Sequence, residues 1–167
     1  QLDVTIGGQR LSEAGALVEV RVDQRLSLPA SCDLVIEPRS AATLEVGALG
    51  ERIELRVGGP GGRLLFCGEC CSREVTHAAG AAPRLSLRAY DAVINLARTQ
   101  HVRAHVGVTP GDLLEELARS ATIRVSTDER GPVHAYVVQD RQTDLALCSD
   151  ICGRAGLYFF LAQETLE

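Results

Sequence analysis

The sequence predicts an α+β fold that consists mainly of antiparallel β-sheet. Three observations support this prediction. Apolar and polar residues alternate with a period of two in several segments of the first half, as in strands with one buried and one wet face. Glycine- and proline-rich turns separate these segments. Helical patterns with capping residues appear from residue 91 onward.

The first half contains the expected strands. They cover residues 17–23, 32–38, 52–57, 63–77 and 84–90. In the first of them, Val18, Val20 and Val22 are expected on one face, opposite three charged residues. The side chains expected on the buried faces of two later strands are Ile53, Leu55, Val57, Leu85, Leu87 and Ala89. The loop GGPGG (58–62) predicts a hairpin, and AAGAAP (78–83) predicts the next turn.

Three helices are expected in the second half. Asp91 can cap a short helix over 92–98. Thr109 followed by Pro110 predicts the start of a helix that ends near Ser120, because a hydroxyl cap followed by proline suits a first turn. Its apolar stripe is expected to contain Leu113, Leu114, Leu117 and Ala118, with Asp112 in the first turn and Glu115 and Glu116 on the outer face.

The last helix is expected to begin at Thr143 or Asp144 and to end before Gly156, which would adopt a left-handed conformation. Its inward side chains are expected to be Leu145, Leu147, Cys148, Ile151 and Cys152. Further strands are predicted over 122–127, 132–139 and 157–161. A boundary between two domains is expected near 99–108, where the composition changes from all-β to mixed.

The composition excludes several classes of protein. The 167 residues include 17 arginines, no lysine and 22 acidic residues, for a net charge of −5, and 46% of them are hydrophobic. This apolar content argues against disorder, and no uncharged apolar run of about 18 residues predicts a membrane span. The acidic balance and the 4% aromatic content disfavour nucleic-acid binding. Because the chain begins at Gln1 and contains no methionine, we expect it to be a segment of a longer protein.

Six cysteines raise the possibility of a metal or redox site. Cys67, Cys70 and Cys71 form a C-x-x-C-C cluster, and Cys148 and Cys152 could supply a second pair on one helix face. Strand geometry argues against a single chelating cluster, because Cys67 and Cys71 would share one face while Cys70 points to the other. Burial of the thiols as small apolar side chains is the simpler interpretation.

No metal ligand is predicted among the four histidines either. His77, His101, His105 and His134 show no helical H-x-x-x-H pattern, and His101 and His105 lie in an expected strand. No phosphate-binding, nucleophile or zinc-protease motif occurs.

No residue is predicted to be catalytic, to bind a cofactor or to hold a metal. Asp91, Asp144 and Asp150 could act as acids, but the first two are explained as helix caps. Arginines on strand faces could bind phosphate, yet cross-strand ion pairing with the glutamates that alternate with them is favoured. The arginines are Arg52, Arg56, Arg84 and Arg88, and the glutamates are Glu51, Glu54 and Glu74.

The order of three segments resembles a known family. The first is LFCGECCSREVTHAAGAAPRLSLRAYDAVINLAR, the second is TPGDLLEELARS (109–120), and the third is VVQDRQTDLALCSDICGRAGLYFFL (137–161). Together they are similar to the N-terminal half of VgrG-type spike proteins and phage late control D proteins, the baseplate hubs of contractile injection systems. The chain departs from that pattern at Gln142, Thr143, Ala146 and Leu147.

This resemblance implies a structural role without enzymatic activity or cofactor. It implies a homotrimer in which two tube-like barrel lobes per protomer, with short packing helices, form a pseudo-sixfold ring. Residues 1–100 would be the first β-barrel-like lobe, and 101–167 a second, mixed and incomplete one that leads into a spike. The implied partners are further copies of the chain, the inner tube protein, the spike tip and other baseplate proteins, with no nucleic acid. Assembly would occur in the bacterial cytoplasm, and the product would be a phage tail-like particle or virion.

Two other functions stay open from the sequence. One is a small zinc- or redox-active module that uses the five cysteines Cys67, Cys70, Cys71, Cys148 and Cys152. The other is a monomeric β-barrel binding domain, whose polar strand faces would meet only bulk solvent.

Overall fold

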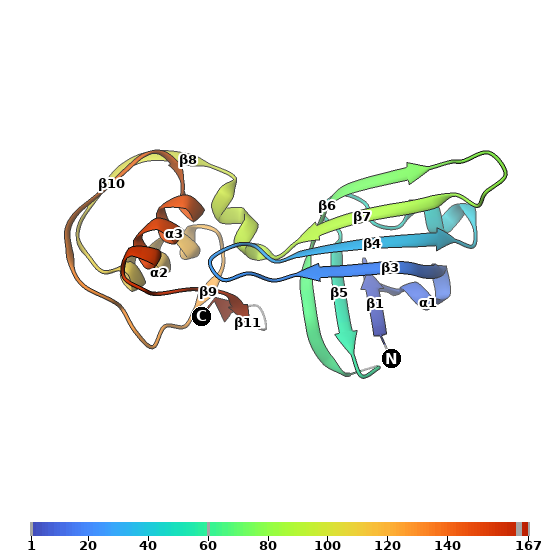
Figure 1. Ribbon diagram of the computed structural model, residues 1–167, viewed down its shortest axis with the longest axis horizontal. Helices are drawn as coiled ribbons and strands as arrows, with labels where there is room; N and C mark the ends of the chain where they lie inside the picture. The colour runs from blue at the N-terminus through green and yellow to red at the C-terminus, as the bar shows by residue number, and fades with distance from the viewer. Residues whose placement is uncertain (1, 60, 163–164, 167) are drawn as a thin grey trace. The chain divides into compact units, whose positions relative to one another are not determined.

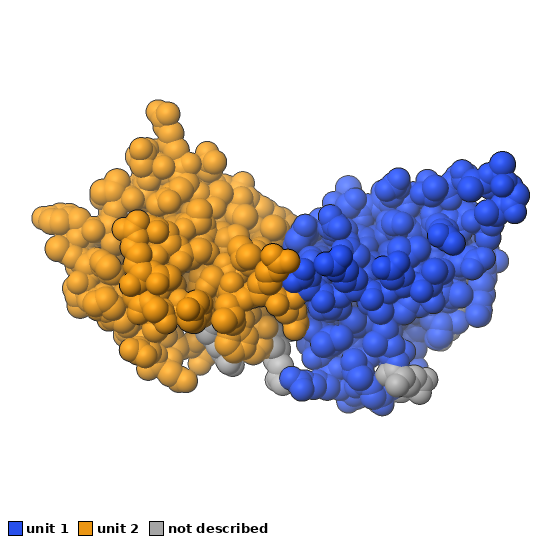
Figure 2. All heavy atoms as spheres, in the orientation of Figure 1, with its two compact units in different colours: residues 1–23, 30–91 blue, residues 24–29, 92–167 orange. Residues whose placement is uncertain are grey.

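The computed structural model describes residues 2–59, 61–162 and 165–166. The chain divides into two compact units (Figure 2). Unit 1 comprises residues 1–23 and 30–91, and unit 2 comprises 24–29 and 92–167. The sequence analysis placed the boundary after residue 100, whereas the structure assigns 92–100 and the short segment 24–29 to the second unit.

Unit 1 is built on one seven-stranded antiparallel sheet, with the strand order β2-β1-β5-β6-β7-β4-β3. Its strands are β1 (Leu2–Ile6), β2 (Gln9–Arg10), β3 (Gly15–Asp23), β4 (Ser31–Pro38), β5 (Arg52–Val57), β6 (Arg63–Thr76) and β7 (Arg84–Tyr90). A one-turn helix α1 (Leu11–Ala14) and a 3-10 helix η1 (Ala41–Glu45) complete the unit. All five strands predicted for the first half are present.

Strand β6 turns the corner of this sheet. Its first half pairs with β5 and its second half with β7, and Glu69 is opposite Arg52 on one side and Tyr90 on the other. Figure 1 shows β6 curving, so that β1 and β5 run across the direction of β3, β4 and β7. At the corner, a Cβ on Gly68 would lie 2.2 Å from the carbonyl oxygen of Tyr90. Glycine is therefore required here because the two backbones approach closely.

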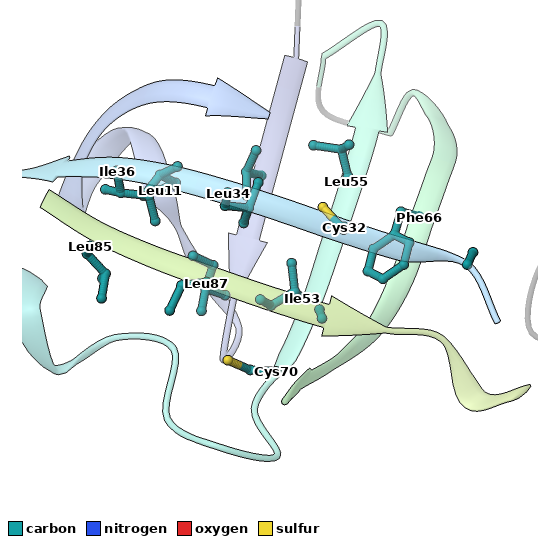
Figure 3. Close-up of a cluster of buried hydrophobic side chains, with 14 residues drawn as sticks. Leu11, Cys32, Leu34, Ile36, Ile53, Leu55, Phe66, Cys70, Leu85 and Leu87 are labelled. Atoms are coloured by element: carbon teal, nitrogen blue, oxygen red, sulfur yellow. The ribbon is translucent and has the colours of Figure 1, made fainter. Parts of the chain in front are cut away.

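The curled sheet encloses a hydrophobic core. Figure 3 shows Leu34, Ile53, Leu55, Phe66 and Leu87 among the buried side chains of this cluster. Alternate side chains of each strand point into this core. In β4, for example, every second residue from Cys32 to Ile36 is buried. The predicted inward residues of β7, Leu85, Leu87 and Ala89, are confirmed as buried.

Two of the four valines predicted to point inward on β3 and β5 are exposed. Val18 is 49% exposed because β3 has a bulge there: Leu17 is opposite Ile36 and Glu19 is opposite Val35, which leaves Val18 without a partner in the ladder. Leu17 packs against the core in its place. Val57 is 44% exposed at the end of β5, where the chain enters the glycine-rich loop.

Unit 2 combines two helices with two small sheets. Its elements are η2 (Ala92–Ala97), β8 (Gln100–Val108), α2 (Pro110–Ser120), β9 (Arg124–Val125), β10 (His134–Thr143), α3 (Asp144–Arg154), β11 (Leu161–Ala162) and β12 (Thr165–Leu166). Strands β8 and β10 form a two-stranded antiparallel ribbon, and β11, β12 and β9 form a three-stranded sheet in that order. The predicted α+β class with mainly antiparallel sheet is confirmed. None of the helices in the described part of the chain has the length and apolar character that a membrane crossing requires.

The helix ends of unit 2 agree with the sequence analysis. Thr109 caps α2, and the apolar stripe predicted for that helix is buried. Thr143 caps α3 by accepting a hydrogen bond from the amide of Ala146 at 3.1 Å. Gly156 follows α3 with a φ of +73°. The amide of Leu157 donates to the carbonyl of Cys152 at 2.9 Å, which closes the last turn.

Strand lengths in unit 2 were predicted less well. The strand expected over 122–127 is reduced to Arg124–Val125, and the one expected over 132–139 runs instead from His134 to Thr143. The apolar run 157–161 is irregular up to residue 160, with Phe159 buried and Tyr158 and Phe160 exposed. The short helix expected over 92–98 is a 3-10 helix over Ala92–Ala97. The carboxylate of Asp91, the expected cap, accepts a hydrogen bond from the amide of Ala30 at 3.0 Å.

The segment 24–29, which connects β3 to β4, is tied to unit 2 by two long-range hydrogen bonds. The amide of Ser27 donates to the carbonyl of Phe159 at 2.8 Å, and the Ser149 hydroxyl donates to the carbonyl of Ser27 at 2.9 Å. Ser27 itself has a φ of +58°, a conformation that a residue other than glycine rarely adopts. The two hydrogen bonds hold Ser27 in this conformation.

Candidate interaction surface

The β8–β10 ribbon presents an apolar face to solvent. In its register Tyr136 is opposite Val106, and Val138 is opposite Ala104. We call the exposed apolar residues on this side the apolar outer face: Val102, Ala104, Val106, Tyr136 and Val138. Their large members are 66–75% exposed. The exposed Asp140, opposite Val102, lies on the same side. Figure 1 shows the ribbon curving beside α2 and α3, which lie on its other side.

The inner face of the ribbon carries a buried polar network. The carboxylate of Asp144, in the first turn of α3, accepts two hydrogen bonds from Arg103 on β8, at 3.0 and 3.3 Å. Its Oδ1 also accepts one at 2.8 Å from the side-chain amide of Gln139 on β10. Gln139 is completely buried and Asp144 almost so. The network therefore joins both strands of the ribbon to the start of α3, where the helix dipole favours a carboxylate.

A bulge in β10 completes this network. Asp140 and Gln142 face successive residues of β8, so Arg141 between them is an extra residue in the strand. Its φ is +51°. The carbonyl of Gln142 then accepts a second hydrogen bond from the Gln139 amide, at 3.0 Å. The strained backbone at Arg141 is thus held by contacts of a buried side chain.

His105 links the ribbon to α2. Its ring is buried on the inner face, and its Nδ1 lies 3.5 Å from a carboxylate oxygen of Glu116. Glu116, expected on the solvated face of the helix, thus has a partner on the ribbon. The inner face contacts α2 through His105 and α3 through the network around Asp144.

One group in this region has the composition of a catalytic triad but not its geometry. The hydroxyl of Thr99 lies 3.0 Å from Nε2 of His101, and a carboxylate oxygen of Asp144 lies 4.0 Å from the same nitrogen. A proton relay needs the hydroxyl and the carboxylate on different ring nitrogens, each within hydrogen-bond distance. This group cannot act as a relay in the arrangement seen.

The start of α2 is fixed by a capping box and by an arginine from the following loop. The hydroxyl of Thr109 accepts a hydrogen bond from the amide of Asp112 at 3.1 Å, and the Asp112 carboxylate accepts one from the amide of Thr109. Arg130 pairs with both Asp112 and Glu115. Hydrogen bonds from Thr109, and then the Arg130 charge, hold the pKa of the Asp112 carboxyl below its usual value.

The outer face of the unit 1 sheet carries paired charges. Glu54 accepts from Arg52 at 2.8 Å and from Arg56 at 3.3 Å, and the hydrogen bond from Arg52 is the main cause that lowers the pKa of Glu54. Arg88 on β7 pairs across the sheet with Asp33 on β4, at 2.6 Å. Cross-strand pairing, as predicted, is seen for Arg88, although its partner Asp33 was not among the expected ones. The pairs of Arg52 and Arg56 with Glu54 lie within the one strand β5.

Glu51 has a different role from the ion pair that was expected. Its carboxylate accepts hydrogen bonds from the backbone amides of Gly47 and Ala48, at 2.9 and 3.2 Å. These bonds stabilise the loop before β5, and they are made to backbone amides rather than to the arginines of the sheet.

The cysteines behave as isolated side chains. All six lie in the described residues, and no disulfide joins any of them. Cys70 is buried and Cys71 exposed, as strand alternation predicts. Cys148 and Cys152 lie in the core of unit 2, where burial raises the pKa of both thiols and so keeps them protonated and unreactive. In the described ranges, no group of three or more His, Cys, Asp or Glu side chains could hold a metal ion.

Comparison with known protein families assigns the chain to one of them. A model of the family described as phage tail baseplate hub (GPD) matches residues 23–166. The chain belongs to the phage tail baseplate hub family. This confirms the resemblance to VgrG-type and late control D hub proteins. No curated protein matches the chain at a significant level.

Solved structures share the hub-family fold at low sequence identity. The 43 kDa tail protein of prophage MuSo2 from Shewanella oneidensis matches 99% of the chain with a TM-score of 0.79 and 12% identity. A tail protein from Neisseria meningitidis gives 99%, 0.71 and 20%, respectively. The E. coli c3393 protein, described as a component of the type VI secretion system, gives 98%, 0.69 and 15%. The chain spans about half of each of these structures, 52%, 48% and 47% respectively.

The structure also explains one motif of the resemblance. In the third quoted segment, Gln139 lies within β10 and Asp144 is the first residue of α3. Their two buried side chains are hydrogen-bonded to each other. Sequence analysis did not find Arg103, the third member of this network, or the apolar outer face. The signal that could have found them is the alternation in 100–108, where valine and alanine alternate with arginine and histidine.

Proposed function

We propose that this hub-family chain is a structural component at the base of the spike in a contractile injection system. Three copies form a pseudo-sixfold ring that joins the tail tube to the spike. The observation that carries this proposal is the family match over residues 23–166, on a fold shared with tail proteins and a type VI secretion component. The partners are further copies of the chain, the inner tube protein, the spike tip and other baseplate proteins.

The chemistry of the described side chains supports a role without catalysis. The one hydroxyl–imidazole–carboxylate group described above lacks the geometry of a relay. The buried carboxylate of Asp144 is used to join β8, β10 and α3. These polar groups are used in contacts that stabilise the fold, and none of them lies at a substrate site. We further propose assembly in the bacterial cytoplasm, followed by incorporation into a tail-like particle.

The paired charges on unit 1 suit a wall that faces water in a channel. Arg52, Arg56 and Arg88 each contact a carboxylate, so the outer face of the curled sheet is polar while its charges are locally balanced. Such a wall stays wetted without a strong net field. The same face on a monomer would simply contact bulk solvent, so assembly must be measured.

Mass in solution and particle imaging test the proposed function. Purified full-length protein should have the mass of a trimer by sedimentation, and electron micrographs should show rings that associate with tube protein added in excess. A full-length protein that stays monomeric over the whole concentration range, and forms no ring with tube protein, contradicts the proposal. Metal analysis on the same sample tests the zinc alternative, which requires a stoichiometric ion that is lost on unfolding.

A further inference from the structure

A hollow of about 470 Å³ lies at one edge of the three-stranded sheet of unit 2. In that sheet, the first residue of β11 is opposite Leu166, and Leu166 is opposite the last residue of β9. The loop 126–129 that leaves β9 and the segment 157–160 that enters β11 therefore meet at the same edge, and both line the hollow. Its volume is within the range of about 300–1,000 Å³ for ligand sites.

The hollow combines an apolar floor with two accessible aromatic rings. Leu114 on α2 and Cys152 on α3 are buried in the core of unit 2, and Leu157 packs against this core. Tyr158 and Phe160 also line the hollow, and they are 64% and 44% exposed. The residue between them is buried, so the two rings lie on the same side of an extended segment. Exposed rings beside a hollow can contact a ligand without any rearrangement of the core.

The charge around the hollow is negative. Asp128 and Glu129 line it and are exposed, and none of its described lining residues is basic. The next residue along the chain, Arg130, pairs with Asp112 and Glu115, so its charge is already balanced by two carboxylates. The two carboxylates of the lining are therefore left for a cation from outside.

These features together favour a cation that has an apolar stem. A cation is attracted both to carboxylates and to the faces of aromatic rings. The stem of a long basic side chain packs on apolar surface while its charged head stays at the rim. Arginine fits better than lysine, because the planar guanidinium stacks on rings and binds a carboxylate through two hydrogen bonds.

The loop beside the hollow favours a peptide as the carrier of this cation. In the described part of the chain, the backbone amides of Thr127, Asp128 and Glu129 donate no hydrogen bond to another backbone group. An extended peptide along this loop can accept such bonds while one of its side chains enters the hollow. A second copy of the chain is the less favourable source, because each copy carries a net charge of −5 and like charges repel.

We propose that the hollow beside Tyr158 and Phe160 binds an arginine side chain on an extended, basic segment of a partner protein. The guanidinium lies against the two rings and pairs with Asp128 and Glu129, while its stem covers the apolar floor. This docking site goes beyond the proposed hub function and does not depend on the trimeric ring.

A defined peptide tests the requirement for charge. The probe is acetyl-Gly-Arg-Leu-Arg-Gly-amide, titrated calorimetrically into full-length protein at low ionic strength. The same peptide with citrulline, a neutral isostere of arginine, should bind at least about tenfold more weakly, because its hydrogen bonds to the carboxylates lose their charge. Added salt should weaken the arginine peptide, since the carboxylates are exposed. Spermidine, a cation without a peptide backbone, should bind at least about tenfold more weakly than the arginine peptide.

Two variants remove the carboxylates or one ring. Asp128→Asn combined with Glu129→Gln should weaken the arginine peptide at least about tenfold. Tyr158→Leu keeps an apolar side chain but removes a ring, and it should weaken binding about three- to tenfold. The melting temperature should stay that of the wild type in both variants, because the substituted side chains are exposed.

Matched controls change the same residue types away from the hollow. Asp140→Asn combined with Glu74→Gln removes two exposed carboxylates that do not line it. Tyr136→Leu removes a ring that is 75% exposed on the β8–β10 ribbon. Both controls should bind the arginine peptide with wild-type affinity.

Photo-cross-linking locates the bound peptide. The probe with benzoylphenylalanine in place of leucine should label residues 126–129 or 157–160 in the full-length protein. Equal binding of the citrulline peptide, wild-type affinity in D128N/E129Q or in Y158L, label confined to other regions, or no saturable binding overturns the inference. Spermidine that binds as tightly as the peptide overturns the assignment to a protein partner. None of these results contradicts the hub proposal, which is decided by the mass and the rings of the full-length protein.

Discussion

Replacing Gly68 by alanine should destabilise unit 1 severely. The added Cβ would lie 2.2 Å from the carbonyl oxygen of Tyr90, 2.6 Å from its carbonyl carbon and 2.7 Å from Cζ of Phe66. Cβ atoms essentially never come closer than 3.0 Å to another heavy atom, so the β6 and β7 backbones must separate by about 0.8 Å (3.0 minus 2.2). The neighbouring ladder pair, Glu69 with Tyr90, cannot accommodate this without losing hydrogen bonds.

We expect the free energy of unfolding of unit 1 to fall by about 3 kcal/mol, the upper part of the range for overpacked cores. Hydrogen exchange with mass spectrometry measures it unit by unit, which matters because two units need not unfold together. Exchange of β4 and β7 amides should accelerate about a hundredfold, since each ~1.4 kcal/mol changes an equilibrium tenfold.

Gly153→Ala is the matched control for this experiment. Gly153 lies within α3, and a Cβ built there has no heavy atom within 4 Å. Alanine is the better helix former, so unit 2 should be stabilised by up to about 1 kcal/mol. Unchanged protection of unit 1 in G68A would refute the argument that the sheet corner requires a close backbone approach at this residue.

Three further outcomes are expected. Asp144→Asn should destabilise unit 2 by about 2 kcal/mol in urea denaturation, because it weakens a buried charged network. Asp150→Asn is the control and should change stability by less than about 0.5 kcal/mol, because its i,i+4 ion pair is exposed. Equal effects of the two substitutions would contradict the role given to the network. In native protein, a maleimide should label the exposed Cys71 within minutes and leave Cys148 unlabelled, because Cys148 is buried and its pKa is raised; peptide mapping decides between them. The pKa of Asp112 is lower in the folded protein than its ordinary 3.8, so the ionised carboxylate contributes its full stabilisation above pH 3.8 and loses it as the pH falls through the lowered pKa. Asp112→Asn should therefore make the free energy of unfolding less dependent on pH in the acid range. An unchanged pH dependence in this variant would refute the argument.

The sequence predicts those parts of the fold that depend on local pattern. Strands such as β7 alternate without interruption, so their buried faces follow directly. Thr109 and Pro110 mark the start of α2 because capping involves residues three positions apart. Gly156 is predictable from a similarly local signal, because the residue that follows a helix often has a left-handed conformation, which glycine adopts easily.

The missed features depend on contacts between distant residues. The bulge that exposes Val18 is set by pairing with β4, and nothing within 17–23 indicates it. Arg103 and Asp144 are 41 positions apart, so their pairing follows only once β8, β10 and α3 are assembled. Alternation in 100–108 gives two faces but does not say which one is inward, and a polar inner face is the exception. The run 157–161 is apolar, yet periodicity alone cannot establish a strand there.

The attachment of residues 24–29 to unit 2 has a consequence for how the protein is made. During synthesis, Ser27 leaves the ribosome long before Ser149, whose hydroxyl binds its carbonyl from 122 positions away. The β3–β4 hairpin can form early, but its tip must wait until Phe159 has emerged. Unit 2 is consequently not encoded by a continuous stretch of the gene. A fragment that starts at residue 92 would lack the segment 24–29, which belongs to unit 2. For this unit to be complete on its own, 24–29 must be supplied as a fused or added peptide.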